Sequence, residues 1–204
     1  MRQLDPRLTF DPQQEANREF AKTVVISATQ LAQGGEITAA VASYQEALRL
    51  NATLPITPEV EANRQYAPVM AGRATELARS GEITASLAAI SQAVQLDPYV
   101  EISANTWNSI CWNGALAGLA AQVMAACENA VAAEPEDGNI RDSRGLARAL
   151  MGDIEGAIED FEFFIAWAKR TGNGRNIDWR ERYVTELKAG QNPFTPAELE
   201  KLRK

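Results

Sequence analysis

Apolar residues recur along most of the chain at intervals of three and four, which is the period of an amphipathic α-helix. The pattern predicts two long helices over residues 12–33 and 58–79, each followed by a shorter helix over residues 38–50 or 84–96. The apolar faces of the two shorter helices are formed by Ala40, Val41, Tyr44, Ala47 and Leu48 and by Leu87, Ile90, Ala93 and Val94. The sequence therefore predicts helices that pack in pairs through one side.

Residues that start and stop helices support these boundaries. Asp11 and Thr57 are capping residues, and each stands directly before a proline, which is favoured at the first helical position. Glycine follows the long helices at Gly34-Gly35 and at Gly81, as expected at a helix end. The predicted unit is a helix, a tight turn and a second helix.

A block of 46 residues occurs twice in succession. Residues 8–53 and 54–99 are identical at 19 of 46 aligned positions, and the longest shared string, 35–39, returns as 81–85. Self-similarity at a fixed period predicts that one supersecondary unit stacks on the next. Such arrays present an extended surface rather than a single catalytic pocket.

The second helices resemble the tetratricopeptide repeat (TPR). In that family a small residue, a bulky apolar residue and another small residue follow the turn glycine at fixed spacing. Ala40, Tyr44 and Ala47 match this order, and the second copy differs in having Ser86 at the first position. The family period is 34 residues, whereas the repeated block has 46. The additional residues are expected to lengthen or precede the first helix of each unit.

Two further units follow at the family period. Trp107 occupies the tryptophan position of the family, and the turn glycine Gly118 lies 34 residues before Gly152 of the next unit. The resemblance implies an all-α fold, a right-handed α-α superhelix (TPR-like solenoid) of four helical hairpins plus a carboxy-terminal capping helix. The expected organisation is one domain, 1–204, with repeat 1 (8–53) and repeat 2 (54–99) carrying extended first helices, repeat 3 (104–137), repeat 4 (138–170) and the cap (177–204).

The end of the chain differs from the repeats. A polar, glycine-broken loop over residues 170–175 precedes a predicted helix over residues 177–189. The residues of this helix expected to face inward are Trp179, Tyr183, Val184 and Leu187. Thr195 and Glu198 have the spacing of a capping box around a proline, which predicts a short helix through Leu202.

The stretch 107–199 also resembles a carboxy-terminal module of bacterial multidomain repeat and signalling proteins. The strings that carry this resemblance are ICWNG, IRDSRGLARALMGDIEGAIEDFEFFIAWAK and LKAGQNPFTPAELE. In such proteins the module follows other repeats or signalling domains. The resemblance implies that the chain is a module of a larger bacterial protein.

The net charge of the chain and the residue types that it lacks disfavour several classes of partner and of catalytic chemistry. The chain has a net charge of −7, a pI near 4.8 and no histidine. The negative charge disfavours nucleic acid and anionic membranes as partners. The lack of histidine removes the commonest general base and the commonest metal ligand. We therefore predict a protein that is not an enzyme and that uses no metal and no cofactor.

The two cysteines, Cys111 and Cys127, are sixteen residues apart and lack CxxC spacing. They fall at packing positions of the repeat, so we predict two buried, unreactive thiols in a reducing compartment. The amino-terminal segment MRQLDPRLTF lacks a charged start followed by an apolar run, and no stretch approaches the roughly 18 apolar residues that span a bilayer. A cytoplasmic protein is therefore expected.

Arg141, Arg144 and Arg148 share one face of a predicted helix, at positions where the family has bulky apolar residues. Because burial of unpaired guanidinium groups is costly, acidic or carbonyl partners are required. One hypothesis is a structural salt-bridge network, for which the candidate acids are Asp142, Asp153, Glu155, Asp160 and acids of the tail. The alternative is a ligand-sensing module in which the arginines bind a small anion, a carboxylate or a phosphate.

The favoured function is non-catalytic protein–protein interaction, with a peptide or partner domain on a concave surface lined mainly by the first helix of each unit. The residues expected to contact the partner are Thr29, Gln33, Thr75, Arg79, Asn105, Asn108, Trp112 and Asp142. The groove positions do not match the residues by which some TPR domains clamp a chaperone tail. Self-association into a homo-oligomer stays open, because the amino-terminal unit has no evident cap.

Overall fold

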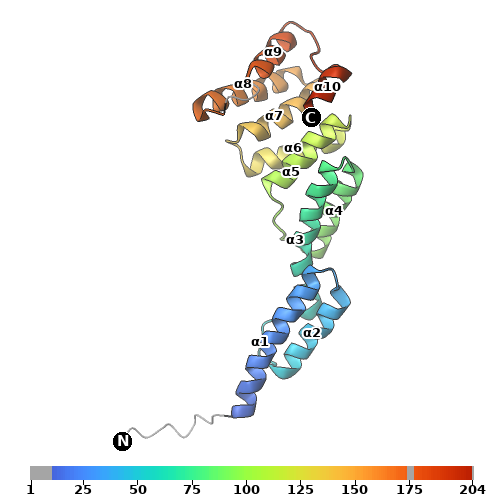
Figure 1. Ribbon diagram of the computed structural model, residues 1–204, viewed down its shortest axis with the longest axis vertical. Coiled ribbons are helices and arrows are strands. Elements are labelled where there is room, and N and C mark those ends of the chain that lie inside the picture. The colour runs from blue at the N-terminus through green and yellow to red at the C-terminus, as the bar shows by residue number, and fades with distance from the viewer. Residues whose placement is uncertain (1–10, 174–176, 204) are drawn as a thin grey trace, which may run out of the picture. The chain divides into compact units, whose positions relative to one another are not determined.

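The computed structural model describes residues 11–173 and 177–203, and these form ten α-helices and no strand (Figure 1). The helices are α1 (Pro12–Gln33), α2 (Ile37–Leu50), α3 (Pro58–Arg79), α4 (Ile83–Leu96), α5 (Ala104–Leu116), α6 (Ala120–Ala133), α7 (Gly138–Met151), α8 (Ile154–Thr171), α9 (Ile177–Lys188) and α10 (Pro196–Leu202). The MRQLDPRLTF segment, which contains the start of the predicted first repeat, and residues 174 and 175 of the predicted loop lie outside the described residues.

The predicted helix boundaries agree with the structure to within one residue. Asp11 caps α1 as expected, since its carboxylate accepts hydrogen bonds from the backbone N–H of Gln13 (2.9 Å) and Gln14 (3.3 Å). Thr195 caps α10 by accepting from the N–H of Glu198 at 3.2 Å. The capping box is only half formed, because the Glu198 carboxylate turns instead to Tyr183 and Arg182 of α9.

The four hairpin turns share one backbone feature. Each contains a glycine with a positive φ, and these are Gly35 (84°), Gly81 (85°), Gly118 (80°) and Gly152 (86°). A side chain at such a position would meet its own backbone, so glycine is the residue that allows the chain to reverse in so few residues.

The described residues divide into two compact units, 11–69 with 92–100 and 70–91 with 101–203. In the first unit α1 packs against α2, and the fully buried residues of their core are Ala28, Ala32, Ala40, Tyr44 and Ala62. Alanine lets the helices approach closely. The one large residue, Tyr44, is satisfied at its polar end, where its hydroxyl lies 2.8 Å from Thr29 Oγ1.

In the second unit α5 packs against α6, α6 against α7, α7 against α8, and α8 against α9. Gly114 of α5 allows α6 to approach closely, because a Cβ atom there would lie 2.4 Å from Val123 of α6. Two hydroxyl contacts involve α3, of which one connects it to α4 and the other connects it to this stack. Ser86 of α4 donates to the carbonyl of Ala74 in α3 at 2.6 Å, and Thr75 of α3 donates to Thr106 of α5 at 3.0 Å.

The cap of the second unit is aromatic. Phe161 of α8, Tyr183 of α9 and Phe194 of the segment before α10 pack with ring centroids 4.9 to 6.1 Å apart. Tyr183, Val184 and Leu187 are buried as predicted. Trp179 is not, since 43% of it is exposed.

Two residues predicted to face the core are exposed, and helical geometry explains both. Trp179 precedes Arg180, which is buried and shares a face with Tyr183 and Leu187, so Trp179 points about 100° away from that face. Val94 is 44% exposed for the same reason, because its neighbour Ala93 takes the buried position. In both helices the predicted apolar face is too wide by one residue at its edge.

The cysteines form a disulfide, so the prediction of two free thiols was wrong. Cys111 lies on α5 and Cys127 on α6, and their Cα atoms are 4.8 Å apart. The tight turn at Gly118 brings the two helices side by side, and both cysteines face the interface, where they are buried. The spacing of sixteen residues, which has no meaning as a metal motif, is the spacing that places two residues opposite each other across this hairpin.

Reduction of the disulfide is expected to lower the free energy of unfolding by about 3 kcal/mol. This is the value expected for a loop of about 15 residues, and the two cysteines are 16 positions apart. Urea unfolding with and without reductant measures the difference. A Cys111→Ala/Cys127→Ala variant is the control, because its stability should not respond to reductant. Thiols that react with an alkylating reagent in the native, air-oxidised protein would contradict the pairing.

Candidate functional site

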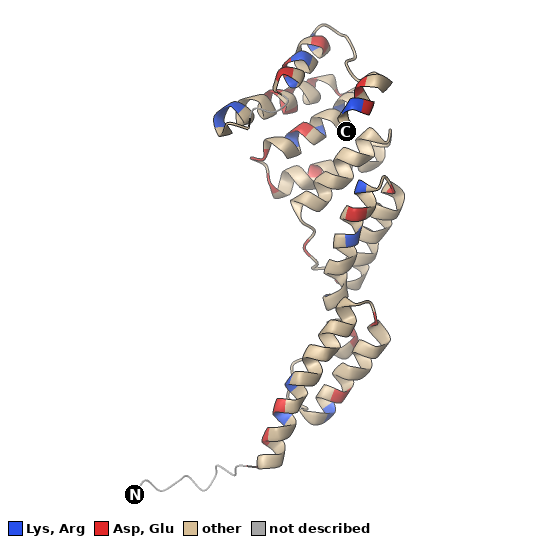
Figure 2. Cartoon of the chain, viewed as in Figure 1, with Lys and Arg blue, Asp and Glu red and all other residues tan. Residues whose placement is uncertain are grey.

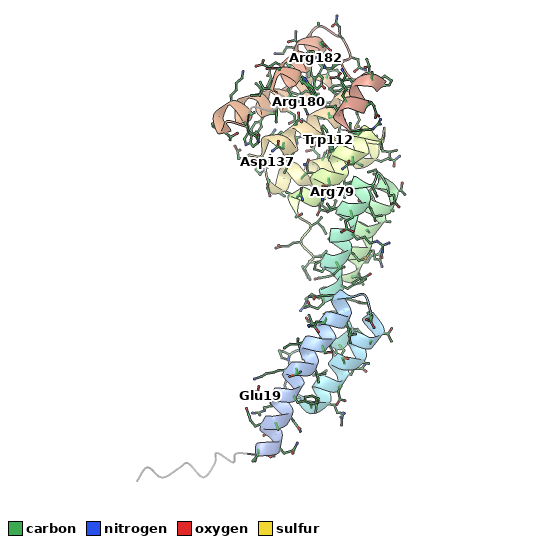
Figure 3. All side chains as sticks on the ribbon, in the orientation of Figure 1. Glu19, Arg79, Trp112, Asp137, Arg180 and Arg182 are labelled. Carbon is green, nitrogen blue, oxygen red and sulfur yellow. A yellow bond between two sulfur atoms is a disulfide. The ribbon has the colours of Figure 1, made fainter. Side chains whose placement is uncertain are left out.

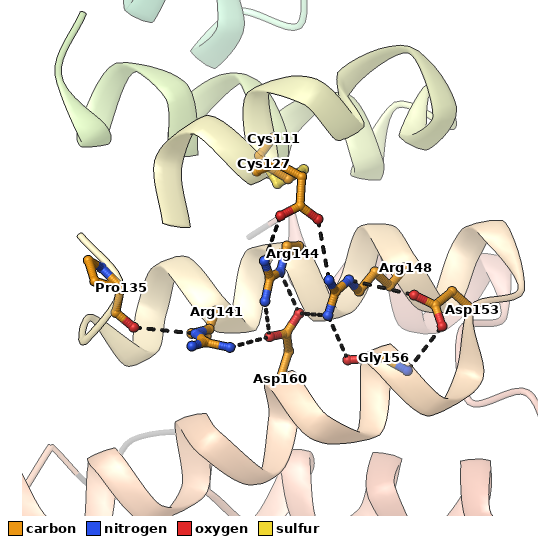
Figure 4. A network of polar contacts seen from close by, with 10 residues as sticks. Cys111, Cys127, Pro135, Arg141, Arg144, Arg148, Asp153, Gly156 and Asp160 are labelled. Atoms are coloured by element: carbon orange, nitrogen blue, oxygen red, sulfur yellow. Dashed lines mark hydrogen bonds and ion pairs between the residues drawn. A yellow bond between two sulfur atoms is a disulfide. The ribbon is translucent and has the colours of Figure 1, made fainter. Parts of the chain in front are cut away.

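The three arginines predicted to share a face of α7 converge on Asp160 of α8, whose side chain is fully buried (Figure 4). Arg144 makes a two-pronged contact with this carboxylate, through Nε to Oδ2 (2.8 Å) and Nη2 to Oδ1 (2.7 Å). Arg141 and Arg148 donate to the same group at 3.3 and 3.0 Å. One carboxylate thus accepts hydrogen bonds from three guanidinium groups.

Acceptors on other elements take up the remaining donors. Glu128 of α6 accepts from Arg144 at 2.7 Å and from Arg148 at 3.3 Å. Arg148 also lies 3.6 Å from Asp153, and Arg141 donates to the carbonyl of Pro135 at 3.3 Å. The guanidinium of Arg141 lies over the ring of Phe163, 4.5 Å from its centroid. The arginines therefore join α6, α7 and α8.

The environment of Arg144 keeps it charged. Burial alone would lower the pKa of its guanidinium, but the hydrogen bonds and charges of Asp160 and Glu128 outweigh burial, and the pKa lies above its ordinary value. Only 6% of the residue is exposed. Because its donors are directed at carboxylates of the chain itself, the arrangement favours the structural network over an anion site.

A second buried ion pair connects α7 to α9. Both carboxylate oxygens of Asp142 accept from Arg180, at 2.7 Å from Nε and 2.5 Å from Nη2. Burial opposes the charge of Arg180, but the bonds to Asp142 raise the pKa of its guanidinium above the ordinary value. Asp142, expected to contact a partner, is 7% exposed and fully engaged. It therefore belongs to the core of the second unit and not to its surface.

A third polar group fixes α10 to α9. Glu198 is buried and accepts hydrogen bonds from the Tyr183 hydroxyl at 2.7 Å and from Arg182. The hydrogen bond from Tyr183 is the main reason that the pKa of the Glu198 carboxyl lies below its ordinary value of 4.5. Burial, together with this bond to a carboxylate, raises the pKa of the Tyr183 hydroxyl.

Acidification is expected to loosen α10. Because the pKa of Glu198 is lower in the folded chain than in the unfolded one, its stabilising contribution is complete above the ordinary value of 4.5 and is lost as the pH falls through the folded value. Urea unfolding at about pH 7 and about pH 4 measures this loss. A Glu198→Gln variant should show a smaller decrease between the two pH values; an equal decrease would contradict the assignment.

The predicted partner-contact residues of the first unit differ in accessibility. Gln33 is exposed, and its amide donates to Gln65 at 3.4 Å. Thr29 is half-buried and pairs with Tyr44, so it stabilises the packing of α1 on α2. Gln33 is therefore the more accessible of the two.

In the second unit the predicted residues lie on α3 and α5. Thr75 is bound to Thr106, whereas Asn105 is exposed. Asn108 is half-buried, and its Oδ1 atom is buried without a hydrogen bond from the described residues. The structure brings Arg79 and Trp112 together at the rim of a common hollow (Figure 3).

Sequence reasoning missed three of the charged residues that matter here. Glu128, Arg180 and Arg203 were not singled out, because their partners lie 16 to 87 residues away in the chain. One signal was available in the sequence: α4 and α5 carry no charge, whereas α7 to α10 carry many, as Figure 2 shows. A high density of charged residues on helices that have a buried face indicates ion pairs inside the protein.

The described residues contain neither a membrane-spanning helix nor a metal-binding cluster. No helix in residues 11–173 and 177–203 is long and apolar enough to cross a bilayer. In the same part of the chain no group of three or more cysteine, aspartate or glutamate side chains is arranged to bind a metal ion.

Comparison with known proteins decides the fold. No family model matches the sequence, and no curated protein matches it. Among solved structures, the crystal structure of the TPR domain of P58(IPK) superimposes with a TM-score of 0.50 and 18% sequence identity over 89% of this chain. The chain has the fold of a TPR domain. It spans 48% of that structure's length, and at this identity the similarity concerns the fold. The all-α, TPR-like architecture expected from the sequence is confirmed.

Proposed function

We propose that this TPR-like chain is a non-catalytic scaffold that binds a peptide or a partner domain. The observation that supports the proposal most directly is the TPR fold, in which helical hairpins succeed one another and leave side chains of the first helices at the surface. On α5 these include exposed Asn105 and half-buried Trp112, and Trp112 lines a hollow of about 240 Å³. An aromatic ring with polar neighbours is the usual centre of a protein-binding surface.

The proposal includes no bond-making chemistry. The chain has no histidine, and its buried charged residues form pairs such as Arg144 with Asp160 and Arg180 with Asp142. Paired groups of this kind stabilise a fold, whereas catalysis needs an acid or base that can reach a substrate.

Anion sensing by Arg141, Arg144 and Arg148 is the weaker alternative, because these arginines already bind Asp160 and Glu128. A rise in melting temperature with inorganic phosphate would support sensing if Arg148→Ala abolished it. The scaffold hypothesis expects no such rise.

A peptide-display selection against the immobilised full chain tests the scaffold function. We expect enriched peptides that bind the purified chain in calorimetry and that bind less tightly to an Asn105→Ala/Asn108→Ala variant. Glu159→Ala, an exposed change on α8, is the matched control and should leave binding unchanged. A selection without any enriched family of binding peptides would overturn the proposal.

The remaining expectations stay predictions. They are the single solenoid domain with its repeat boundaries, the cytoplasmic location, the origin as a module of a larger bacterial protein, the absence of nucleic acid and membrane partners, and self-association. The disulfide of the α5–α6 hairpin weighs against the cytoplasm, since such bonds persist mainly in oxidising compartments. Light scattering at several concentrations measures self-association directly.

A further inference from the structure

A hollow of about 240 Å³ lies within the second unit, where the end of α3, the end of α5 and the end of α10 meet. Its lining residues are Arg79, Ser80, Gly81, Trp112, Asn113, Leu116, Ala117 and Arg203. Two guanidinium groups and one indole ring thus share a small volume. Figure 3 labels Arg79 and Trp112, which come from α3 and α5.

The two arginines of the hollow are held differently. Arg203 donates to the carbonyl of Leu116 and, at 3.1 Å, to Glu200, so its position is fixed and its charge is offset. Arg79 is exposed at the last position of α3, and its guanidinium makes no hydrogen bond or ion pair with another described residue. Arg79 is therefore the cation that is free to pair with a ligand.

The rest of the hollow leaves this charge uncompensated. None of the residues that line the hollow is acidic, and helix α5 carries no charged residue. The carboxylate of Glu82, just outside this lining, accepts a hydrogen bond from Ser80 at 3.0 Å. Trp112 is half-buried, so part of its ring remains at the surface as an apolar contact. The side-chain amide of Asn113 donates to the carbonyl of Ser109 at 2.8 Å, which fixes its orientation.

The carboxylate of a ligand could belong to a chain terminus or to an acidic side chain, and the backbone around the hollow favours the side chain. The carboxyl ends of α3 and α5 lie here, and the carboxyl end of a helix exposes carbonyl groups rather than N–H groups. Capture of a chain-terminal carboxylate uses a nest of backbone N–H groups, which helix carboxyl ends do not supply. A side-chain carboxylate does not need such a nest, because it can pair with the guanidinium of Arg79.

We propose that this hollow binds an acidic segment of a partner protein, in which a glutamate or aspartate pairs with Arg79 and an adjacent apolar side chain packs on Trp112. The proposal rests on the scaffold function and names the chemistry of its partner. The negative charge of the whole chain repels such a segment at long range, so binding is carried by short-range contacts.

The experiment uses three synthetic hexapeptides and the uniformly ¹⁵N-labelled full chain. The first is acetyl-Ala-Leu-Glu-Glu-Leu-Ala-amide, the second replaces both glutamates with glutamine, and the third is the glutamine peptide with a free terminal carboxylate. The indole N–H signal of Trp112, assigned by its loss in Trp112→Phe, reports binding. We expect saturable shifts with the glutamate peptide and binding at least about fivefold weaker with both glutamine peptides.

Charge reversal at Arg79 provides the decisive comparison. Arg79→Glu should weaken the glutamate peptide about tenfold, because attraction becomes repulsion. Arg73→Glu makes the same change on the exposed surface of the same helix, outside the hollow, and should change affinity less than about twofold. Arg79→Met checks that loss of charge alone weakens binding.

Three results would overturn the proposal: no shift of the Trp112 signal with the glutamate peptide, equal effects of Arg79→Glu and Arg73→Glu, or tightest binding of the peptide with the free terminal carboxylate. The peptide-display selection distinguishes failure of the acidic-segment proposal from failure of the scaffold function. Enriched peptides that are not acidic, and whose affinity is unchanged by Arg79→Glu, would be consistent with the scaffold function and would contradict only the proposed acidic partner segment.

Discussion

Replacing Asp160 with alanine is expected to lower the free energy of unfolding by about 3–5 kcal/mol, the range observed when one partner of a buried ion pair is removed. Asp160 is fully buried and accepts hydrogen bonds from Arg141, Arg144 and Arg148. Its removal leaves Arg144, which is 6% exposed, with Glu128 alone. Urea unfolding of the two proteins measures the difference.

Two further substitutions calibrate this result. Asp160→Asn keeps the shape and one acceptor but removes the charge, so its effect should be intermediate. Glu159→Ala, at the exposed neighbouring position, should change stability by less than about 0.5 kcal/mol. An Asp160→Ala protein as stable as Glu159→Ala would show that the three arginines do not depend on this carboxylate.

Replacing Arg180 with alanine is expected to cost a comparable amount, about 3–5 kcal/mol, because Asp142 is then buried without its counter-ion. The loss extends to packing, since the Arg180 guanidinium lies 5.7 Å from the ring centroid of Phe164 and 5.6 Å from that of Tyr183. Thermal and urea unfolding, followed by circular dichroism, provide the measurement.

Replacing both partners should cost far less than replacing one. In Asp142→Leu/Arg180→Met no charge is left unpaired, and apolar side chains of similar volume fill the space between α7 and α9. We expect a stability within about 1 kcal/mol of the natural chain, or above it. A double variant as unstable as Arg180→Ala would mean that the geometry of this pair, rather than its charge balance, stabilises α9.

The parts of the fold that depend on local chemistry could be predicted from the sequence. Asp11 and Thr195 cap their helices through contacts two or three residues away, and Gly118 and Gly152 turn the chain by their own backbone freedom. Each signal is complete within a few residues. Helix ends were therefore predicted to within one residue.

The parts that depend on long-range register could not be predicted. The residues Asp142 and Arg180 are 38 positions apart, and they meet because α9 packs against α8, which in turn packs against α7. The sequence showed that the arginines of α7 need acids, and Asp160 was among several candidates. Choosing it required knowing which face of α8 meets α7.

The cysteines and the candidate site illustrate the same limit. Cys111 and Cys127 were interpreted by their spacing in sequence, whereas their pairing follows from the faces that α5 and α6 turn to each other. Arg79 and Trp112 were predicted as separate contact residues. That they share a hollow with Arg203 depends on the return of α10 to the end of α5, which no local pattern indicates.

The contacts of Glu128 limit where this chain can be truncated without loss of buried ion pairs. Glu128 belongs to α6, yet it completes the bonding of Arg144 and Arg148 in α7. A fragment that starts at Gly138 would keep the α7–α8 hairpin but leave two of its guanidinium groups short of an acceptor. Among the described residues, Arg144 would keep Asp160 as its carboxylate partner and lose Glu128. In the design of helical-repeat proteins, each hairpin is usually treated as an exchangeable structural unit. In this protein the third and fourth hairpins have to be moved together.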